Sequence, residues 1–264
     1  MNEPNLVQIE ITGHVGSLIL ADEKRLNAFG LALADQALAG LETLERHDDV
    51  RAVVLRGAGR AFSVGGDVKQ MGQDIAAGDP GAFFEAPLAA FNRLAVALGA
   101  LPKPVLASVH GAVAGVAFNV MLACDLVVAA ESTRFTQAFV SLGLSVDGGG
   151  SWILPRLVGR ARASELAMLP TTLDAETARA WGLVNWVVPD ADLEAETRRR
   201  AVQLAAGPTR AIAHTKALLN GADRRTLADQ AEQERLAQVD NSAHPDFTEG
   251  VTAFLDKRPP DFRG

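Results

Sequence analysis

The sequence predicts an α/β fold, in which strands and helices alternate along most of the chain. Short apolar runs that end near glycine are followed repeatedly by segments with apolar residues at helical spacing, and the connections have the length of βαβ crossovers. The chain has 264 residues, of which 48% are hydrophobic and 22% are charged. This composition is typical of a globular protein that can bury a large core without disulfides.

The elements are expected in a simple order. Alternating apolar residues at 7–11 and an apolar run at 18–20 predict two strands of a hairpin within residues 5–23. The later elements expected up to residue 132 are a helix over 30–49, a strand over 50–59, a glycine loop over 59–71, a helix over 81–99, a strand over 104–111, a helix over 114–125 and a strand over 126–132.

The last third is richer in charge and in helical patterns, at 159–170, at 174–188 and from about residue 193 onward. We therefore place a domain boundary there, between a core domain over 1–195 and a C-terminal helical region over 196–264.

Charge and composition exclude several classes of function. The formal net charge of −7 argues against a nucleic-acid partner, because binding phosphates needs a basic surface. No apolar run has the length of a membrane span, and the N-terminus lacks a signal-peptide pattern, so we expect a cytoplasmic protein with no membrane partner. The single Cys124 fits a reducing compartment, and the five histidines lack metal-ligand spacing, so no metal site is expected.

Two glycine-containing segments can present backbone amides to a ligand. In the loop over 59–71, Gly65 and Gly66 allow a close approach of backbone to ligand, whereas Asp67 could equally be a helix cap. In the second segment, Gly115 precedes a helix whose first amides have no internal partner and suit an oxyanion. Packing of small residues is the alternative explanation. Asn119 lies on the same helix face, either as a hydrogen-bonded core residue or as a group that orients a base or a substrate.

Asp147 is the most notable acid in the sequence. It follows the apolar stretch over 140–146 and precedes three glycines at 148–150. A carboxylate in a poorly hydrated pocket has a raised pKa and is a better general base near neutral pH. A turn or a helix cap is an equally good interpretation of the local sequence. No phosphate-binding, dinucleotide-binding or serine-hydrolase motif accompanies it.

Taken in order, the motifs resemble the crotonase (enoyl-CoA hydratase/isomerase) superfamily. They are RLNAF (25–29), GRAFSVGGD (59–67), KPVLASVHGAVAG (103–115), ACDLVVAAESTRF (123–135), WGLVNWVVP (181–189) and HPDFTEGVTAFLDKRPPDF (244–262). The resemblance implies a spiral of ββα units with a C-terminal helical trimerisation region. It also implies homotrimers or dimers of trimers and an acyl-CoA substrate, with coenzyme A as part of that substrate and no separate cofactor.

The resemblance also implies roles for individual residues. The amides of Val64 and Val116 correspond to the pair that binds the thioester oxygen as it becomes an enolate. Val116 replaces a frequent glycine, and its side chain is expected to narrow the acyl pocket. The expected contacts to substrate and coenzyme A are Arg25, Leu26, Ala28, Gly66, Asp67, Gly115 and Phe139, together with Phe254 and Lys257 from across a subunit boundary.

The departures from the hydratase pattern favour an isomerase. The two glutamates that hold and activate water in hydratases correspond to Asn119 and Phe139, and neither is acidic. Asp147 remains as a single base that moves a proton along an enolate, as in the branch that includes epoxyphenylacetyl-CoA isomerase. The alternatives are a hydratase with water held by Asn119, a dehalogenase or thioesterase with Asp147 as nucleophile, and a non-catalytic CoA-ester binding relative.

Overall fold

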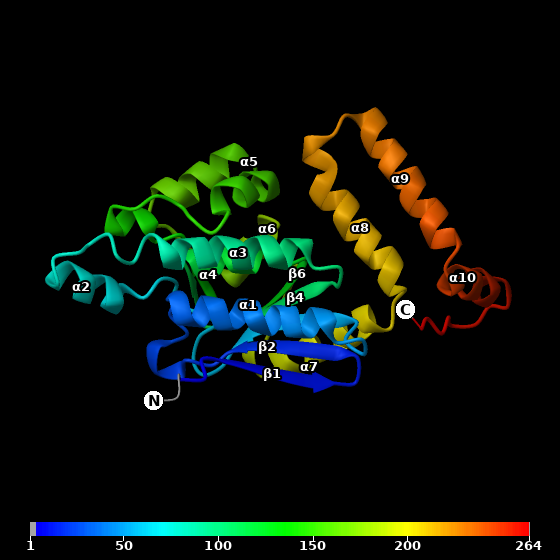
Figure 1. Ribbon diagram of the computed structural model, residues 1–264, viewed down its shortest axis with the longest axis horizontal. Helices are drawn as coiled ribbons and strands as arrows, with labels where there is room; N and C mark the ends of the chain where they lie inside the picture. Colours follow the sequence, from blue (N-terminus) through cyan, green and yellow to red (C-terminus); the bar gives the residue numbers. More distant parts are fainter. Residues whose placement is uncertain (1–3, 264) are drawn as a thin grey trace.

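Two sheets and ten α-helices make up the computed structural model over the described residues, 4–263 (Figure 1). The strands are β1 (Val7–Thr12), β2 (Val15–Leu20), β3 (Ala52–Gly57), β4 (Val105–Val109), β5 (Ala112–Ala114), β6 (Leu126–Ala130), β7 (Arg134–Thr136), β8 (Thr172–Asp174) and β9 (Trp186–Val188). The α-helices are α1 (Leu31–Arg46), α2 (Val68–Ala76), α3 (Ala86–Ala100), α4 (Val116–Leu122), α5 (Gly150–Met168), α6 (Ala175–Ala180), α7 (Leu193–Ala205), α8 (Thr209–Gly221), α9 (Leu227–Ser242) and α10 (Pro245–Leu255).

The larger sheet has the strand order β1-β2-β3-β4-β6-β9. Its first pair is antiparallel and confirms the predicted hairpin: Thr12 pairs with Val15 across a turn in which Gly13 has a φ of 57°. The other neighbours in this sheet are parallel. The smaller sheet has the order β5-β7-β8, with β5 parallel and β8 antiparallel to β7.

Successive segments repeat one pattern, in which a strand of the large sheet leads to the small sheet and then to a helix. β4 leads to β5 and α4, and β6 leads to β7 and α5. After β3 the chain reaches Ser63, which pairs with Val113 of β5 as an isolated parallel bridge before α2 begins. These ββα units, together with the C-terminal helices, confirm the predicted fold class.

The central strands bury both faces, which explains why they appear in the sequence as continuous apolar runs. In β3, Val53 and Leu55 belong to the main core with residues of α1 and α3. Val54, between them, points to the opposite face, where it belongs to a second cluster with Ala201 of α7. Helices therefore cover both faces of the large sheet.

The structure corrects several sequence predictions. The helix expected over 81–99 begins only at Ala86, and the segment expected as a glycine loop over 59–71 enters α2 at Val68. The segment 174–188 is not helical throughout: Gly182, with a φ of 85°, follows the end of α6, and the apolar residues after it form β9 on the edge of β6. The predicted boundary at 195 falls inside α7, whose apolar side packs on the sheet.

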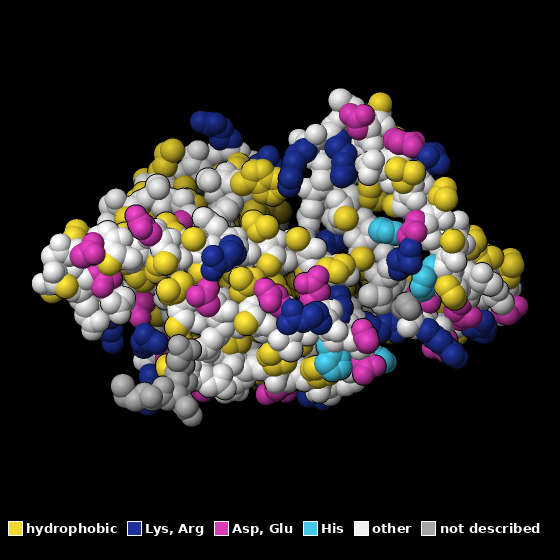
Figure 2. Space-filling view, viewed as in Figure 1, with side chains coloured by type: hydrophobic (Ala, Val, Ile, Leu, Met, Phe, Trp, Pro, Cys, Tyr) yellow, Lys and Arg dark blue, Asp and Glu magenta, His cyan; other side chains and the backbone are white. Residues whose placement is uncertain are grey.

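Helices α8, α9 and α10 extend to one side of the sheets (Figure 1). Lys216 of α8 anchors this arm, since its buried Nζ donates to the Leu98 carbonyl at 2.8 Å and pairs with Asp125 Oδ2 at 2.8 Å. Apolar side chains are visible on the surface of this arm, α8 to α10 (Figure 2). Phe254 of α10 has an exposed fraction of 83%. Within residues 4–263, every helix is too short or too polar to cross a bilayer.

Candidate active site

The two segments that were expected to offer amides lie side by side. The Ser63 amide donates to the Ala112 carbonyl at 3.1 Å, and the Ala114 amide donates to the Ser63 carbonyl at 3.1 Å. At Gly65, which has a φ of 87°, a Cβ atom would lie 2.6 Å from the Ala114 carbonyl oxygen. Only glycine fits this approach, so the glycine at position 65 is explained by backbone packing.

The two predicted oxyanion donors differ in their present hydrogen bonds. Val116 is the first residue of α4, and its amide has no acceptor within the described part of the chain. The Val64 amide donates to the Leu26 carbonyl at 3.2 Å. Val116 therefore offers a free donor, whereas Val64 can bind a second oxygen only by sharing or exchanging this bond.

Asp147 lies in the turn that leads into α5. The N-cap of that helix is Gly149, with a φ of 80° and no side-chain cap, so the interpretation of Asp147 as a helix cap is wrong. Its Oδ1 atom is buried without a hydrogen-bond partner among residues 4–263. Burial raises the pKa of Asp147 to about 6, as expected for a carboxylate that has lost water. The carboxylate is thus available as a base near neutral pH.

Close contacts hold this turn against the start of α4. A Cβ atom on Gly148 would lie 3.1 Å from Val116 Cγ2 and 3.4 Å from Asn119 Cβ. A methyl group on Gly150 would overlap the Asn119 amide. Asp147 is therefore held beside the helix turn whose first amide is free, and the side chain of Val116 packs against this turn.

Asn119 is fully buried and hydrogen-bonded to the Asp147 turn. Its Nδ2 donates to the Asp147 main-chain carbonyl at 2.8 Å, and its Oδ1 accepts from Gln137 Nε2 at 2.9 Å. The interpretation of Asn119 as a hydrogen-bonded core residue is confirmed, and one of its hydrogen bonds joins it to the main chain of the Asp147 turn. The sequence did not indicate Gln137, since its separation of 18 positions from Asn119 leaves no local pattern.

Phe139 brings an aromatic ring to the same place. Its exposed fraction is 7%, and a Cβ atom on Gly115 would lie 3.8 Å from the end of the ring. The two positions expected to carry glutamate in a hydratase, Asn119 and Phe139, thus surround the start of α4 with an amide and an apolar ring.

Several of the expected coenzyme A contacts line one cavity of about 370 Å³. Arg25, Ala28 and Asp67 lie on its wall together with Phe83. The Asp67 carboxylate caps α2 by accepting from the Gln70 amide at 3.1 Å, so the cap interpretation is confirmed. It also pairs with Arg25 at 3.1 Å. Asp22 accepts from Arg25 Nε at 2.6 Å, so Asp22 and Asp67 together fix the Arg25 guanidinium beside the glycine loop.

Backbone pairing holds the rest of this set in place. Phe29 and Gly66 form an isolated parallel bridge, which joins the first motif to the glycine loop. Leu26 adopts a left-handed φ of 53° and turns its carbonyl toward the Val64 amide. Five of the expected contact residues in 25–28 and 66–67 are therefore neighbours, although they are nearly 40 residues apart in sequence.

The comparison with known families decides the assignment. The family described as enoyl-CoA hydratase/isomerase matches residues 10–264. The chain belongs to the enoyl-CoA hydratase/isomerase family. Membership confirms the crotonase resemblance and makes this chain an enzyme of that superfamily.

Relatives within the enoyl-CoA hydratase/isomerase family carry different activities in their names. The chain is 40% identical to 1,2-epoxyphenylacetyl-CoA isomerase of Escherichia coli strain K12 over 252 residues, 95% of each chain. It is 39% identical over 260 residues, 98% of each chain, to a Rhodobacter capsulatus protein named "Probable enoyl-CoA hydratase". The crystal structure of an enoyl-CoA hydratase from Polaromonas sp. JS666 has a TM-score of 0.89 at 35% identity, covering 97% of this chain and 99% of that one.

Two expected contacts lie elsewhere in this family member. Phe254 is at the end of α10 and Lys257 follows it, with a left-handed φ of 55°. In Figure 1, α10 and α2 lie at opposite ends of the molecule, so one chain does not bring these residues to the cavity beside Arg25.

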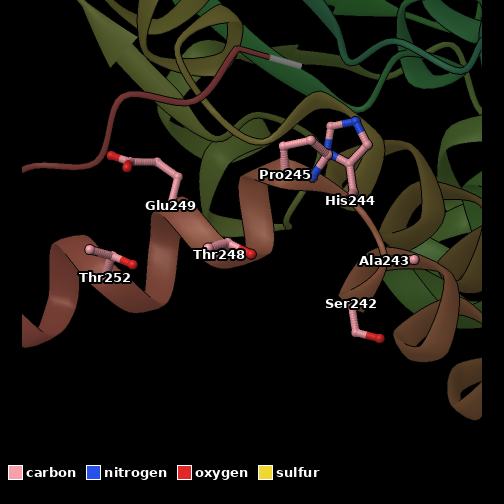
Figure 3. Close-up of a pocket in the computed structure, with 7 residues that line it drawn as sticks. All are labelled: Ser242, Ala243, His244, Pro245, Thr248, Glu249 and Thr252. Atoms are coloured by element: carbon pink, nitrogen blue, oxygen red, sulfur yellow. The ribbon is translucent and has the colours of Figure 1, made fainter.

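A second cavity, of about 560 Å³, lies between α9 and α10 and contains none of the expected site residues (Figure 3). Mostly small and polar residues line it, among them His244, whose side chain caps α10. Hydrogen bonds from Arg258 and from the Asp261 amide lower the pKa of Glu249 to about 2. The acid in this cavity is therefore a paired structural carboxylate and not a base.

Proposed function

We propose that this enzyme is an isomerase of acyl-CoA thioesters that shifts a double bond through an enolate, with Asp147 as its single general base. The observation that carries the proposal is the half-buried Asp147 carboxylate, which has an unpaired oxygen and belongs to a turn whose Gly148 packs against the start of α4, where the Val116 amide is free. A carboxylate and an oxyanion donor side by side are the groups that proton transfer next to a carbonyl requires.

The proposed reaction begins with the thioester oxygen bound to the Val116 amide, with the Val64 amide as a second donor. Asp147 removes a proton from the carbon next to the carbonyl of a β,γ-unsaturated acyl group. The electron pair of that C–H bond delocalises over the diene and the oxygen, where the amides stabilise the negative charge. The protonated carboxyl group of Asp147 then returns the proton to the γ carbon, which leaves an α,β-unsaturated thioester and restores the carboxylate.

The other acids near the site in sequence have different roles, which supports a mechanism with one base. Asp125 accepts from the Val105 amide at 2.7 Å and pairs with Lys216 at 2.8 Å. Glu131 is exposed in the turn after β6. Addition of water across a double bond requires a group that holds water and a proton donor, and neither Asn119 nor Phe139 supplies an acid.

The cavity lined by Arg25, Ala28 and Asp67 supports a role in binding coenzyme A. The Arg25 side chain is 44% exposed and is oriented by Asp22 and Asp67, so its exposed part can donate to a phosphate group. We also propose a homotrimer or a dimer of trimers, in which the exposed apolar residues of α9 and α10 pack between subunits, among them Phe254 and Leu255.

A second candidate function is hydration, which the 39% identity to the Rhodobacter capsulatus relative favours. The two reactions are distinguished by incubating the enzyme with α,β- and β,γ-unsaturated acyl-CoAs. We expect isomers of unchanged mass. Loss of conjugated absorbance with the mass of one added water would instead establish a hydratase. An acyl ester on Asp147, detected by protein mass, would establish covalent catalysis.

The role of Asp147 is tested by Asp147→Asn. We expect turnover to fall by at least about a thousandfold, because the base is lost, while the affinity for a non-reactive CoA thioester stays within about twofold. Asp174→Asn is a matched control, since Asp174 caps α6 away from the site. Undiminished turnover by Asp147→Asn refutes the role, and tight binding without turnover by the wild type would indicate a non-catalytic relative.

A further inference from the structure

A chain of three hydrogen-bonding groups leads away from the proposed base. Gln137 lies between β7 and the 3₁₀ turn over Phe139–Leu142, and its exposed fraction is 1%. Its Nε2 donates to Asn119 Oδ1 at 2.9 Å, and Asn119 Nδ2 donates to the Asp147 carbonyl at 2.8 Å. The chain therefore joins the strand end of the small sheet to α4 and then to the Asp147 turn.

The direction of this chain is fixed by chemistry. A main-chain carbonyl only accepts, so Asn119 must present its NH₂ group to Asp147 and its oxygen to residue 137. Residue 137 must then donate, which an ionised carboxylate or an apolar side chain cannot do. Glutamine fulfils this requirement with Nε2. Both amides thus have one orientation that satisfies the pair.

Gln137 meets this requirement at a cost. Its Oε1 atom is buried without a partner among the described residues, and an unpaired buried acceptor is destabilising. The residue that follows, Ala138, has a left-handed φ of 38°, which is strained for alanine. A strained turn and an unpaired oxygen in the same place indicate that the geometry here is retained for the donor it supplies.

We infer that Gln137 is a positioning residue, which locks the orientation of Asn119 and through it the Asp147 turn. The inference rests on the proposed function only where the orientation of the Asp147 turn is expected to affect the rate of isomerisation. The Asp147 carbonyl also accepts from the Gly150 amide at 3.0 Å, but this bond lies within the turn and does not join it to α4. The neighbouring segments, which are α4, residues 137–142 and the first turn of α5, carry no titratable side chain. In addition, no charged side chain shifts the titration of Asp147.

The test compares Gln137→Met, which keeps the length of the side chain but removes the donor, with the wild type. We expect kcat for isomerisation to fall about tenfold, the rate equivalent of one neutral hydrogen bond, with KM within about twofold. Thr133→Val is the matched control: Thr133 is fully buried and donates to the Val109 carbonyl at 3.3 Å, outside the chain. This variant also loses one buried hydrogen bond and is expected to keep the wild-type kcat.

A second readout does not depend on turnover. In protein with ¹³C-labelled aspartate carboxyl groups, Asp147 is assigned from the signal that disappears in Asp147→Asn. A loosened turn admits water, so Gln137→Met should move the Asp147 titration to lower pH. Gln137→Glu should move it to higher pH, because the new carboxylate adds negative charge nearby and turns the Asn119 amide over.

Unchanged kcat and unchanged titration in Gln137→Met would overturn the inference. If that variant does not fold, Gln137→Glu carries the same test, and wild-type rate and titration there would also overturn it. A shifted titration in Gln137→Met, combined with full turnover by Asp147→Asn, would support the positioning of the turn and refute only the proposed function. The two failures are therefore distinguishable.

Discussion

Replacing Asp147 with asparagine is expected to stabilise the fold near neutral pH. Burial raises the pKa of Asp147 from 3.8 to about 6, so the folded state holds its proton more tightly than the unfolded chain does. The contribution of Asp147 to the free energy of unfolding therefore falls as the pH rises from 3.8 to about 6, and then stays level. Asparagine, which is always neutral, avoids this loss.

The size of the effect follows from the shift. Two pKa units correspond to about 3 kcal/mol, which we reduce to about 1.5 kcal/mol because part of the carboxylate remains in contact with water. The unfolding free energies of Asp147→Asn and the wild type should agree at the acidic end. At neutral pH the variant should exceed the wild type by this amount. A gain in stability on removal of the negative charge at Asp147 would be typical of a functional group retained at a cost to the fold.

Urea unfolding in a series of buffers from below to above pH 6 measures the difference. Asp174→Asn is the control with the opposite sign, because hydrogen bonds from Thr177 lower the pKa of Asp174. That carboxylate stabilises the fold above its unfolded pKa, so Asp174→Asn should show no gain at neutral pH. A difference between Asp147→Asn and the wild type that does not vary with pH would refute the reasoning.

Three further predictions concern the scaffold. Gly65→Ala should lower the unfolding free energy by about 2–3 kcal/mol, measured by urea unfolding, and should reduce kcat/KM, because the new methyl group meets the Ala114 carbonyl. Lys216→Met should cost about 3 kcal/mol in the same assay by leaving Asp125 without its buried partner, and Lys216→Met combined with Asp125→Asn should recover part of the loss. Arg25→Ala should raise KM for acyl-CoA about tenfold at unchanged kcat, and an effect on kcat alone would contradict its binding role.

Much of the fold was predictable from local patterns. The hairpin over β1 and β2 and the helix α1 follow from periodicity, and the central strands follow from apolar runs bounded by glycine. The strands β5, β7 and β8 were not predicted, because each has only three residues and forms only through pairing with segments distant in sequence. Edge pairing likewise makes β9 a strand within a segment that has a helical composition.

The site was predictable as a set of positions but not as a network. The apolar approach and the three glycines indicated a poorly hydrated Asp147, and burial indeed raises its pKa. The local sequence could not show that Asn119 donates to the main-chain carbonyl of Asp147 or that Gln137 donates to Asn119, since both hydrogen bonds join separate elements. It also could not show that the Leu26 carbonyl already accepts from the Val64 amide.

The most direct test of the central claim follows a hydrogen isotope through the reaction. A β,γ-unsaturated acyl-CoA deuterated at the α carbon is converted by the wild type and by Asp147→Asn in ordinary water. One carboxyl group that both removes and returns the proton predicts α,β-unsaturated product with part of the deuterium at the γ carbon, and no product with the variant. Wild-type rates in the variant, or product that carries oxygen from water, would contradict the account.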